Sequence, residues 1–193
     1  MGKVFEGIDS KLAAWIAAQP LFFVGTAPQT GGHVNVSPKG PIESLVVLDP
    51  RTIAYLDLIG SGAETAAHLR DNGRICVMLC AFQGPPRVLR MHGAGRVVQA
   101  GSDEYGRLAA RFEGAPIPGA EHASRSVVVV ELDRIADSCG YDVPLMTPAG
   151  ARTQRDAWVA KKRREGSDAL PAYVAERNAE SIDGLPAFGS QRA

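Results

Sequence analysis

The feature that most constrains the fold of this chain is a succession of short segments rich in β-branched and aromatic residues. Turn signals such as Gly31-Gly32 and Asp49-Pro50-Arg51 separate early segments, and Gln83-Gly84-Pro85-Pro86 separates two later ones. Short strands joined by tight turns favour an antiparallel sheet. The predicted strands cover residues 21–26, 34–38, 45–48, 52–58, 74–81, 87–99 and 126–132.

The last of these segments, residues 126–132, is an almost continuous apolar run. Such a run predicts a strand that is buried on both faces, as in a strand that closes a barrel. Helical patterns interrupt the strands at residues 9–20, 63–70 and 102–112, and Asn72-Gly73 suits a left-handed end of the second helix. The predicted fold class is therefore mainly β with helices (α+β), arranged as a closed or split antiparallel barrel.

The 193 residues are enough for one domain with a substantial core. We expect residues 1–150 to form this domain and residues 151–193 to form a charged, helical extension of it. Trp158 and Tyr173 are the expected anchors of the extension, which also carries a basic cluster at residues 161–164. Two interpretations stay open: a solvated helix, or a clasp on a partner subunit.

The composition excludes several classes of partner. Lys plus Arg and Asp plus Glu number 21 each, so no overall charge favours nucleic acid or an anionic membrane. No apolar run approaches the roughly 20 residues of a membrane-spanning helix. Three cysteines without C-x-x-C spacing, and no secretory signal, favour the cytoplasm.

The four histidines lack the spacing of metal ligands. No Ser-His-Asp or paired-carboxylate pattern is visible, so the sequence predicts neither a metal site nor a hydrolase and identifies no catalytic residue. His68 follows Glu64 by four residues, which predicts a pair on the solvated face of the second helix.

The most informative segment, residues 55–70, reads as a strand, a glycine-bracketed turn and a helix. Free backbone N–H groups at a helix N-terminus attract phosphate, and Gly60 and Gly62 would let a ligand approach closely. Ser61 and Glu64 also match a capping box, which needs no ligand. Both interpretations stay open at this point.

Two further elements carry polar side chains suited to a ligand. Lys39 ends a strand next to Pro38 and Gly40, where a cation could hydrogen-bond a flavin ring, although a solvated loop lysine is the plainer interpretation. Arg90 and His92 share one strand face. An arginine there suits a phosphate, a carboxylate across a dimer interface, or no specific partner.

Three motifs together resemble the pyridoxamine 5′-phosphate oxidase-related flavin-binding family. They are V-N-V-S-P-K-G at 34–40, I-A-Y-L-D-L-I-G-S-G-x-E-T-x-x-H-L-R-x-N-G-R at 53–74 and G-P-P-R-V-L-R-M-H-G-x-G-R-V-V at 84–98. The resemblance covers roughly residues 10 to 135. It implies a six-stranded split β-barrel of the FMN-binding type and a homodimer with FMN between the subunits.

Carried over by position, Ser37 and Lys39 would face the isoalloxazine, and Tyr55 and Asp57 would line the strand beside it. The turn from Ser61 to Thr65 would hold the phosphate, and Arg87 or Arg90 would contribute from a neighbouring strand pair, in one chain or across the interface. The full set of cofactor-binding residues implied in this way is Asn35, Val36, Ser37, Lys39, Tyr55, Asp57, Ser61, Gly62, Thr65, Arg87 and Arg90.

The chain departs from the vitamin oxidases at two places. Glu64-Thr65 stands where those enzymes have adjacent basic residues, and residues 181–188 lack their Arg and His pattern. We therefore expect an FMN-dependent oxidoreductase that acts on a small molecule other than pyridoxamine phosphate. The alternatives are a deazaflavin-dependent reductase, a non-catalytic flavin- or haem-binding protein, and a structural dimer with an empty groove.

Overall fold

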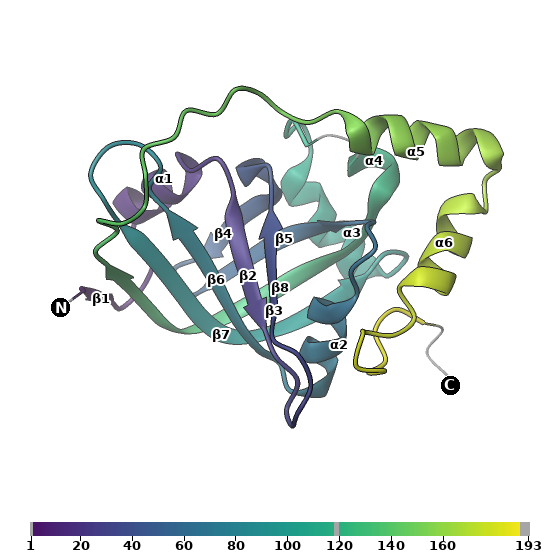
Figure 1. The fold of residues 1–193 in the computed structure, drawn as a ribbon, viewed down its shortest axis with the longest axis horizontal. Coiled ribbons are helices and arrows are strands. Elements are labelled where there is room, and N and C mark those ends of the chain that lie inside the picture. The colour runs from purple at the N-terminus through teal and green to yellow at the C-terminus, as the bar shows by residue number, and fades with distance from the viewer. Residues whose placement is uncertain (1, 118–119, 190–193) are drawn as a thin grey trace.

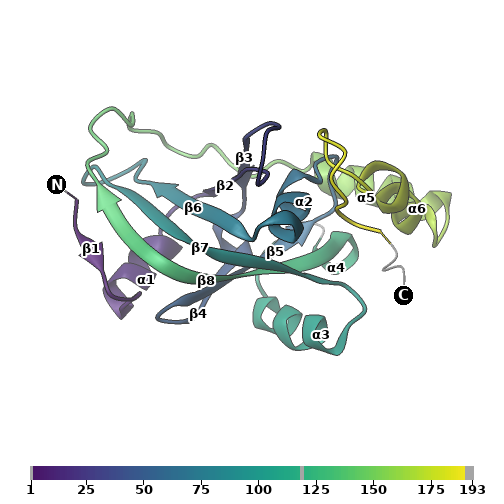
Figure 2. The ribbon, with the colours of Figure 1, turned by 90° about the horizontal axis from the view of Figure 1, so that it is seen from below.

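The computed structural model describes residues 2–117 and 120–189 as a strongly curved antiparallel sheet surrounded by helices (Figures 1 and 2). The strand order is β3-β2-β6-β7-β8-β5-β4, and β1 pairs with β8. The strands are β1 (Val4–Phe5), β2 (Phe22–Thr26), β3 (Asn35–Lys39), β4 (Leu45–Asp49), β5 (Thr52–Leu58), β6 (Arg74–Cys80), β7 (Val88–Gln99) and β8 (Ser124–Ser138).

Helices occupy the connections and the end of the chain. They are α1 (Ser10–Ala17), α2 (Glu64–Asp71), α3 (Asp103–Ala109), α4 (Ala120–Ala123), α5 (Gln154–Glu165) and α6 (Ala169–Arg177), with 3-10 turns at Ile42–Ser44 and Ala110–Phe112. Asp9 caps α1 by accepting a hydrogen bond from the amide of Leu12 at 2.7 Å. Among the described residues, no helix combines the length and hydrophobicity that crossing a bilayer requires.

The α+β class and the antiparallel split barrel are confirmed. Each predicted strand has a counterpart in the sheet, and the two-residue β1 adds an eighth strand where the resemblance implied six. The sheet stays open between the edge strands β3 and β4. Gly73 has φ of 73°, the left-handed conformation predicted for the end of α2.

Strand β8 is apolar on both faces because it separates two hydrophobic cores. Val128 and Val130 point into the barrel with Phe22 and Tyr55. Val127, by contrast, faces the second core, which Phe112 and Ile117 complete beyond α3. Figure 2 shows α2 and α3 on opposite sides of the sheet formed by β7 and β8. Both faces of the strand are therefore buried, as predicted.

The C-terminal helices pack against their own chain. Val159 of α5 and Leu170 of α6 are buried with Ile59, the residue that follows β5. The rings of Trp158 and Tyr173, the predicted anchors, meet edge to face at 5.0 Å. This packing brings the extension beside the turn that links β5 to α2.

The prediction of a solvated His68 is wrong. Its side chain is fully buried, and its Nδ1 lies 2.9 Å from the hydroxyl of Thr26 on β2. Its Nε2 has no hydrogen-bond partner among the described residues. The i, i+4 relation to Glu64 was a weak guide because α2 turns this face toward β2 rather than toward solvent.

Burial lowers the pKa of His68, and the carboxylates of Asp183, Glu64 and Asp71 offset only part of that effect. A histidine with a lowered folded-state pKa takes up its proton more readily in the unfolded state, so the protein should lose stability as the pH falls below about 6.5. We expect the free energy of unfolding to fall by up to about 1 kcal/mol more in the wild type than in His68→Asn between pH 7.5 and 5.5. Urea unfolding at both pH values measures this difference, and equal losses in the two proteins would contradict it.

Candidate functional site

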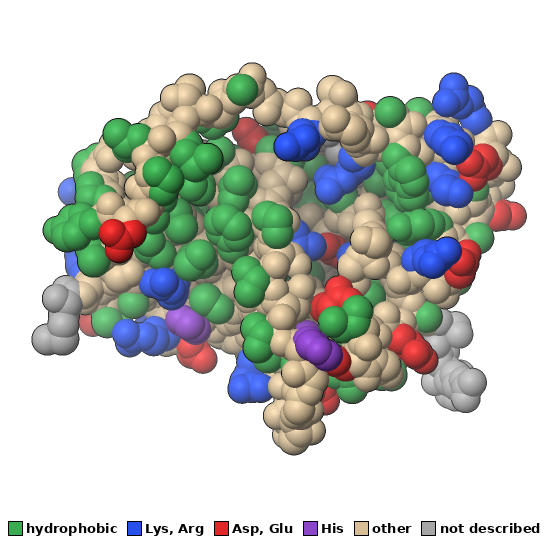
Figure 3. All heavy atoms as spheres, viewed as in Figure 1, with side chains coloured by type: hydrophobic (Ala, Val, Ile, Leu, Met, Phe, Trp, Pro, Cys, Tyr) green, Lys and Arg blue, Asp and Glu red, His purple; other side chains and the backbone are tan. Residues whose placement is uncertain are grey.

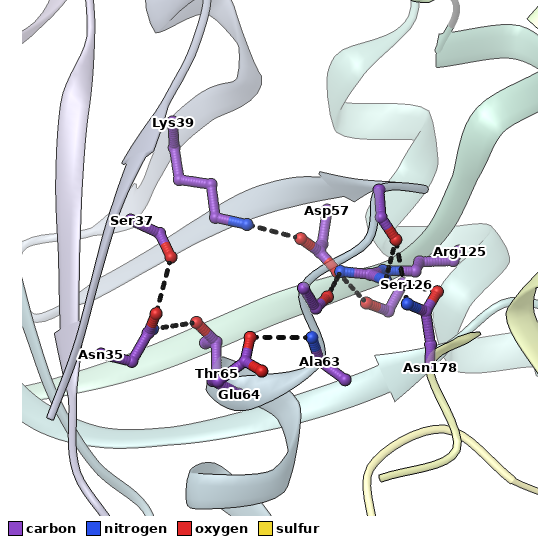
Figure 4. A network of polar contacts seen from close by, with 12 residues as sticks. Asn35, Ser37, Lys39, Asp57, Ala63, Glu64, Thr65, Arg125, Ser126 and Asn178 are labelled. Carbon is purple, nitrogen blue, oxygen red and sulfur yellow. Dashed lines mark hydrogen bonds and ion pairs between the residues drawn. The ribbon is translucent and has the colours of Figure 1, made fainter. Parts of the chain in front are cut away.

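A buried carboxylate organises the end of the barrel beside the turn between β5 and α2. Asp57 lies two residues after Tyr55 on β5, and its side chain is only 6% exposed. The Lys39 ammonium lies 2.9 Å from Oδ1, and the Nε of Arg125 donates to Oδ2 at 2.7 Å (Figure 4). Asp57 therefore joins β3, β5 and β8 at one point.

The two cations determine the protonation state of Asp57. Burial alone would raise the pKa of Asp57, but the charges and hydrogen bonds of Lys39 and Arg125 together outweigh it and hold the pKa at about 2. The carboxylate is therefore ionised at neutral pH. Because two cations face one carboxylate, the cluster keeps a net positive charge.

Arg125 also fixes the turn at residues 60–62. Its NH2 group donates to the carbonyl of Gly62 at 2.8 Å, and its NH1 group donates to Asn178 Oδ1 at 2.7 Å. Asn178, which follows α6 and is fully buried, in turn donates to the carbonyl of Gly60 at 2.9 Å. The Phe188 ring covers the guanidinium at 4.5 Å. The C-terminal extension thus clamps the turn through Arg125.

The clamp directs the amides of this turn away from Arg125. The N–H and C=O of a trans peptide point in opposite directions, so carbonyls held by Asn178 and Arg125 turn the amides of Ser61 and Gly62 to the other side. Within the described residues, the amides of Ser61, Gly62 and Thr65 have no acceptor. These donors are suited to an anion at the start of α2.

The capping-box interpretation is wrong in this structure. Ala63, not Ser61, is the N-cap of α2, and no side chain caps the helix there. The Glu64 carboxylate instead accepts a hydrogen bond from the amide of Ala63 at 3.0 Å. The helix begins two residues later than the capping box requires, which leaves Ser61 exposed beside the pocket.

Asn35 joins β3 to the start of α2. Its Nδ2 donates to the hydroxyl of Thr65 at 3.1 Å, and Ser37 donates to its Oδ1 at 3.0 Å (Figure 4). Asn35 also donates to Thr26 at 3.3 Å, and Thr26 contacts His68. This chain of hydrogen bonds holds the hydroxyls of Ser37 and Thr65 at the pocket wall.

Two adjoining cavities lie at this site. A polar pocket of about 320 Å³ is lined by Ser37, Lys39, Gly60, Ser61, Gly62, Glu64, Thr65, Arg125 and Arg155, among others. A larger cavity of about 940 Å³ has a mostly apolar wall that includes Leu21, Ile42, Phe82 and Met146. The two cavities share Pro38, Lys39, Gly40 and Arg155. Figure 3 shows a hollow below the arch that connects β8 to α5, with hydrophobic side chains on one side and Lys or Arg side chains near the start of α5.

The structure brings most of the predicted site residues together. Asn35, Ser37, Lys39, Asp57, Ser61, Gly62 and Thr65 line the polar pocket or bond to residues that line it. Tyr55 is fully buried inside the barrel, 5.9 Å from the Lys39 ammonium. Val36, on the edge strand β3, is 65% exposed.

Arg87 and Arg90 do not line the polar pocket of this chain. Arg87 pairs with Asp137 at 2.9 Å and covers Trp15, and Arg90 donates to Ser138 at 2.9 Å. Both therefore sit on the part of the sheet where β7 meets the end of β8. A contribution across a dimer interface stays a prediction.

Sequence reasoning missed Arg125, Arg155 and Asn178. Arg125 directly precedes the apolar run of β8, and a charge at the start of a doubly buried strand was a signal that it needs a buried partner. Arg155 and Asn178 carry no local signal, because they reach the site through the path of the C-terminal extension. The described residues hold no group of three or more His, Cys, Asp or Glu side chains that could bind a metal ion.

Comparison with known proteins finds a family model and a curated relative that each match more than half of this chain. A family model described as "Pyridoxamine 5'-phosphate oxidase" matches residues 8–139. The "Pyridoxamine 5'-phosphate oxidase family protein ustO" of Aspergillus flavus is 41% identical over 143 residues, covering 74% of this chain. The aligned part spans 56% of that protein's own length, little more than half.

Solved structures agree on the fold. Two crystal structures of HupZ from Group A Streptococcus are each 21% identical to this chain, with TM-scores of 0.54 and 0.52. The alignments cover 68% and 66% of this chain and 99% and 91% of the HupZ chains. At this level of identity the likeness concerns the fold alone.

Replacing the buried carboxylate tests the cluster. We expect Asp57→Asn to lower the free energy of unfolding by about 3–5 kcal/mol at pH 7, because it leaves two cations without their counter-ion. Since the folded pKa of Asp57 is about 2, its contribution is present above pH about 4 and is lost as the pH falls toward 2. Urea unfolding from pH 7 to pH 3 measures both effects.

The matched control is Glu104→Gln, which removes the carboxylate of an exposed pair with Arg96. Solvent screens this pair, so the variant should change stability little. Equal losses from Glu104→Gln and Asp57→Asn would show that burial does not set the strength of the Asp57 contacts.

Proposed function

The chain belongs to the pyridoxamine 5′-phosphate oxidase family, and on that premise we propose that it is an FMN-dependent oxidoreductase that acts on a small molecule. The polar pocket would hold the phosphate end of FMN, and the adjoining apolar cavity would take the ring and the substrate. A cytoplasmic location belongs to this proposal, in keeping with the free cysteines Cys76, Cys80 and Cys139.

The observation that carries the proposal is the meeting of two unlike cavities at Lys39. On one side lie the amides of Ser61, Gly62 and Thr65, which have no acceptor among the described residues, and on the other lies a mostly apolar wall. A flavin nucleotide has the same division, with an anionic phosphate at one end and a flat ring at the other. The donors present therefore fit this group.

FMN, when bound, would supply the redox chemistry of the reaction. The residues of this chain would bind and orient it. Asp57 holds the ammonium of Lys39 at the boundary of the two cavities, where it can donate to a ring that becomes more negative on reduction. Ser37, fixed by Asn35, offers a hydroxyl at the same wall.

A substrate other than pyridoxamine phosphate is part of the proposal. Residues 181–188, which lack the Arg and His pattern of the vitamin oxidases, serve the fold of this chain instead. Phe188 covers Arg125, and Asp183 pairs with His33 at 2.7 Å. This segment therefore stabilises the site through its contact with Arg125.

We also propose a homodimer with the cofactor at the interface. Val36, Tyr141, Leu145 and Met146 are exposed large apolar side chains, and Met146 lines the open cavity. Covering such side chains with a second copy would remove apolar surface from water. Sedimentation analysis should give twice the chain mass, and a monomer over the working concentration range would contradict the dimer.

Titration with FMN tests the proposed cofactor. We expect flavin fluorescence to be quenched at one FMN per chain with a micromolar or tighter Kd, and bound flavin to be reduced by NADH, NADPH or a reducing substrate. Tighter binding of a deazaflavin cofactor would favour the reductase alternative. Bound FMN that no donor reduces would favour a non-catalytic carrier, and no flavin binding at all would contradict the proposal.

Glu64 should weaken phosphate binding, because its carboxylate lines the same pocket. We expect Glu64→Gln to bind FMN about 3- to 10-fold more tightly, since it removes a like charge and keeps an oxygen for the amide of Ala63. Riboflavin, which lacks the phosphate, should bind both proteins equally. Fluorescence titration measures the two ligands, and an unchanged FMN affinity would place the phosphate away from Glu64.

A further inference from the structure

We infer that Arg155, in the C-terminal extension, is the cation that pairs with the phosphate of the bound flavin nucleotide. The inference rests on the proposed function. It assigns to α5 the positive charge for the phosphate, which the barrel of this chain does not supply at the start of α2. It starts from the absence of a basic residue at Glu64-Thr65.

The charge balance of the polar pocket singles out Arg155. Lys39 and Arg125 are the other cations of the pocket wall, and both pair with Asp57. The carboxylates of Asp57 and Glu64 balance their two charges. A phosphate monoester carries about −1.5 to −2 charges at pH 7, so it needs a further cation at the wall.

Arg155 is also the cation that is free to bind. Within the described residues it has no hydrogen bond or ion pair. Arg125, by contrast, uses all three of its guanidinium nitrogens, on Asp57, Asn178 and Gly62 among others. An unpaired arginine presents a fork of N–H donors that matches the oxygens of a phosphate.

The packing of α5 aims this side chain at the pocket. Val159 of α5 is buried with Ile59, one residue before the turn at residues 60–62. Arg155 precedes Val159 by four residues and therefore lies on the same helix face, one turn nearer the start of α5. This agrees with its place in the wall of the polar pocket, alongside Ser61, Gly62 and Thr65.

The consequence is a divided phosphate site. The barrel supplies the amides and hydroxyls, and the extension supplies the charge. Cofactor binding and docking of the extension would then support each other, because α5 packs on the residue that precedes the phosphate turn.

Comparing FMN with riboflavin in full-length variants tests the inference. Arg155→Gln should weaken FMN binding about 10- to 100-fold, the effect of losing a hydrogen-bonded charge, and should leave riboflavin binding within about twofold. Arg155→Lys should recover most of the FMN affinity. Arg164→Gln, an exposed arginine at the other end of α5, should change neither ligand.

Salt provides a second readout. The FMN affinity of the wild type should fall more steeply with ionic strength than that of Arg155→Gln. Equal weakening of FMN and riboflavin by Arg155→Gln, or no weakening of either, would overturn the inference while wild-type FMN binding upholds the proposed cofactor. A wild type that binds no flavin would overturn both.

Discussion

The contact of one buried carboxylate with two cations determines how this site is built. One carboxylate oxygen of Asp57 pairs with Lys39 of β3, and the other pairs with Arg125 of β8. Because β3 is an edge strand and β8 lies far from it in the sheet order, no ladder of backbone hydrogen bonds joins the two. The side chain of Asp57 makes the connection, and Arg125 extends it to the turn and to Asn178.

A buried charge cluster is a costly way to stabilise a fold, since removing ions from water opposes their mutual attraction. The cluster instead fixes the orientation of the groups that bond to it. Each oxygen and nitrogen of the cluster accepts or donates along a fixed line, so Asn178, itself held by Arg125, keeps the carbonyls of Gly60 and Ser61 on one side of the turn. The amides on the other side are therefore set before any ligand arrives, which reduces the ordering that binding requires.

The sequence predicted the sheet well because strands depend on local composition and turns. The continuous apolar run of β8 indicated burial on both faces, and Asn35, Ser37, Lys39, Asp57, Ser61, Gly62 and Thr65 were found from the motifs and the resemblance. His68 was misplaced because a helix pattern does not say which face meets the sheet. The N-cap was misplaced by two residues, from Ser61 to Ala63. The roles of Arg125, Arg155 and Asn178 depend on contacts between distant segments, which no local pattern reports. Arg125 and Asn178, for example, are 53 positions apart in the sequence.

A crystal structure of the protein grown with FMN tests the central claim most directly, because it shows where each end of the cofactor lies. The account predicts the phosphate within hydrogen-bond distance of the amides between Ser61 and Thr65, with the ring reaching past Lys39 into the apolar cavity. A phosphate bound elsewhere, with the Asp57 cluster and its turn unchanged and unoccupied, would contradict it.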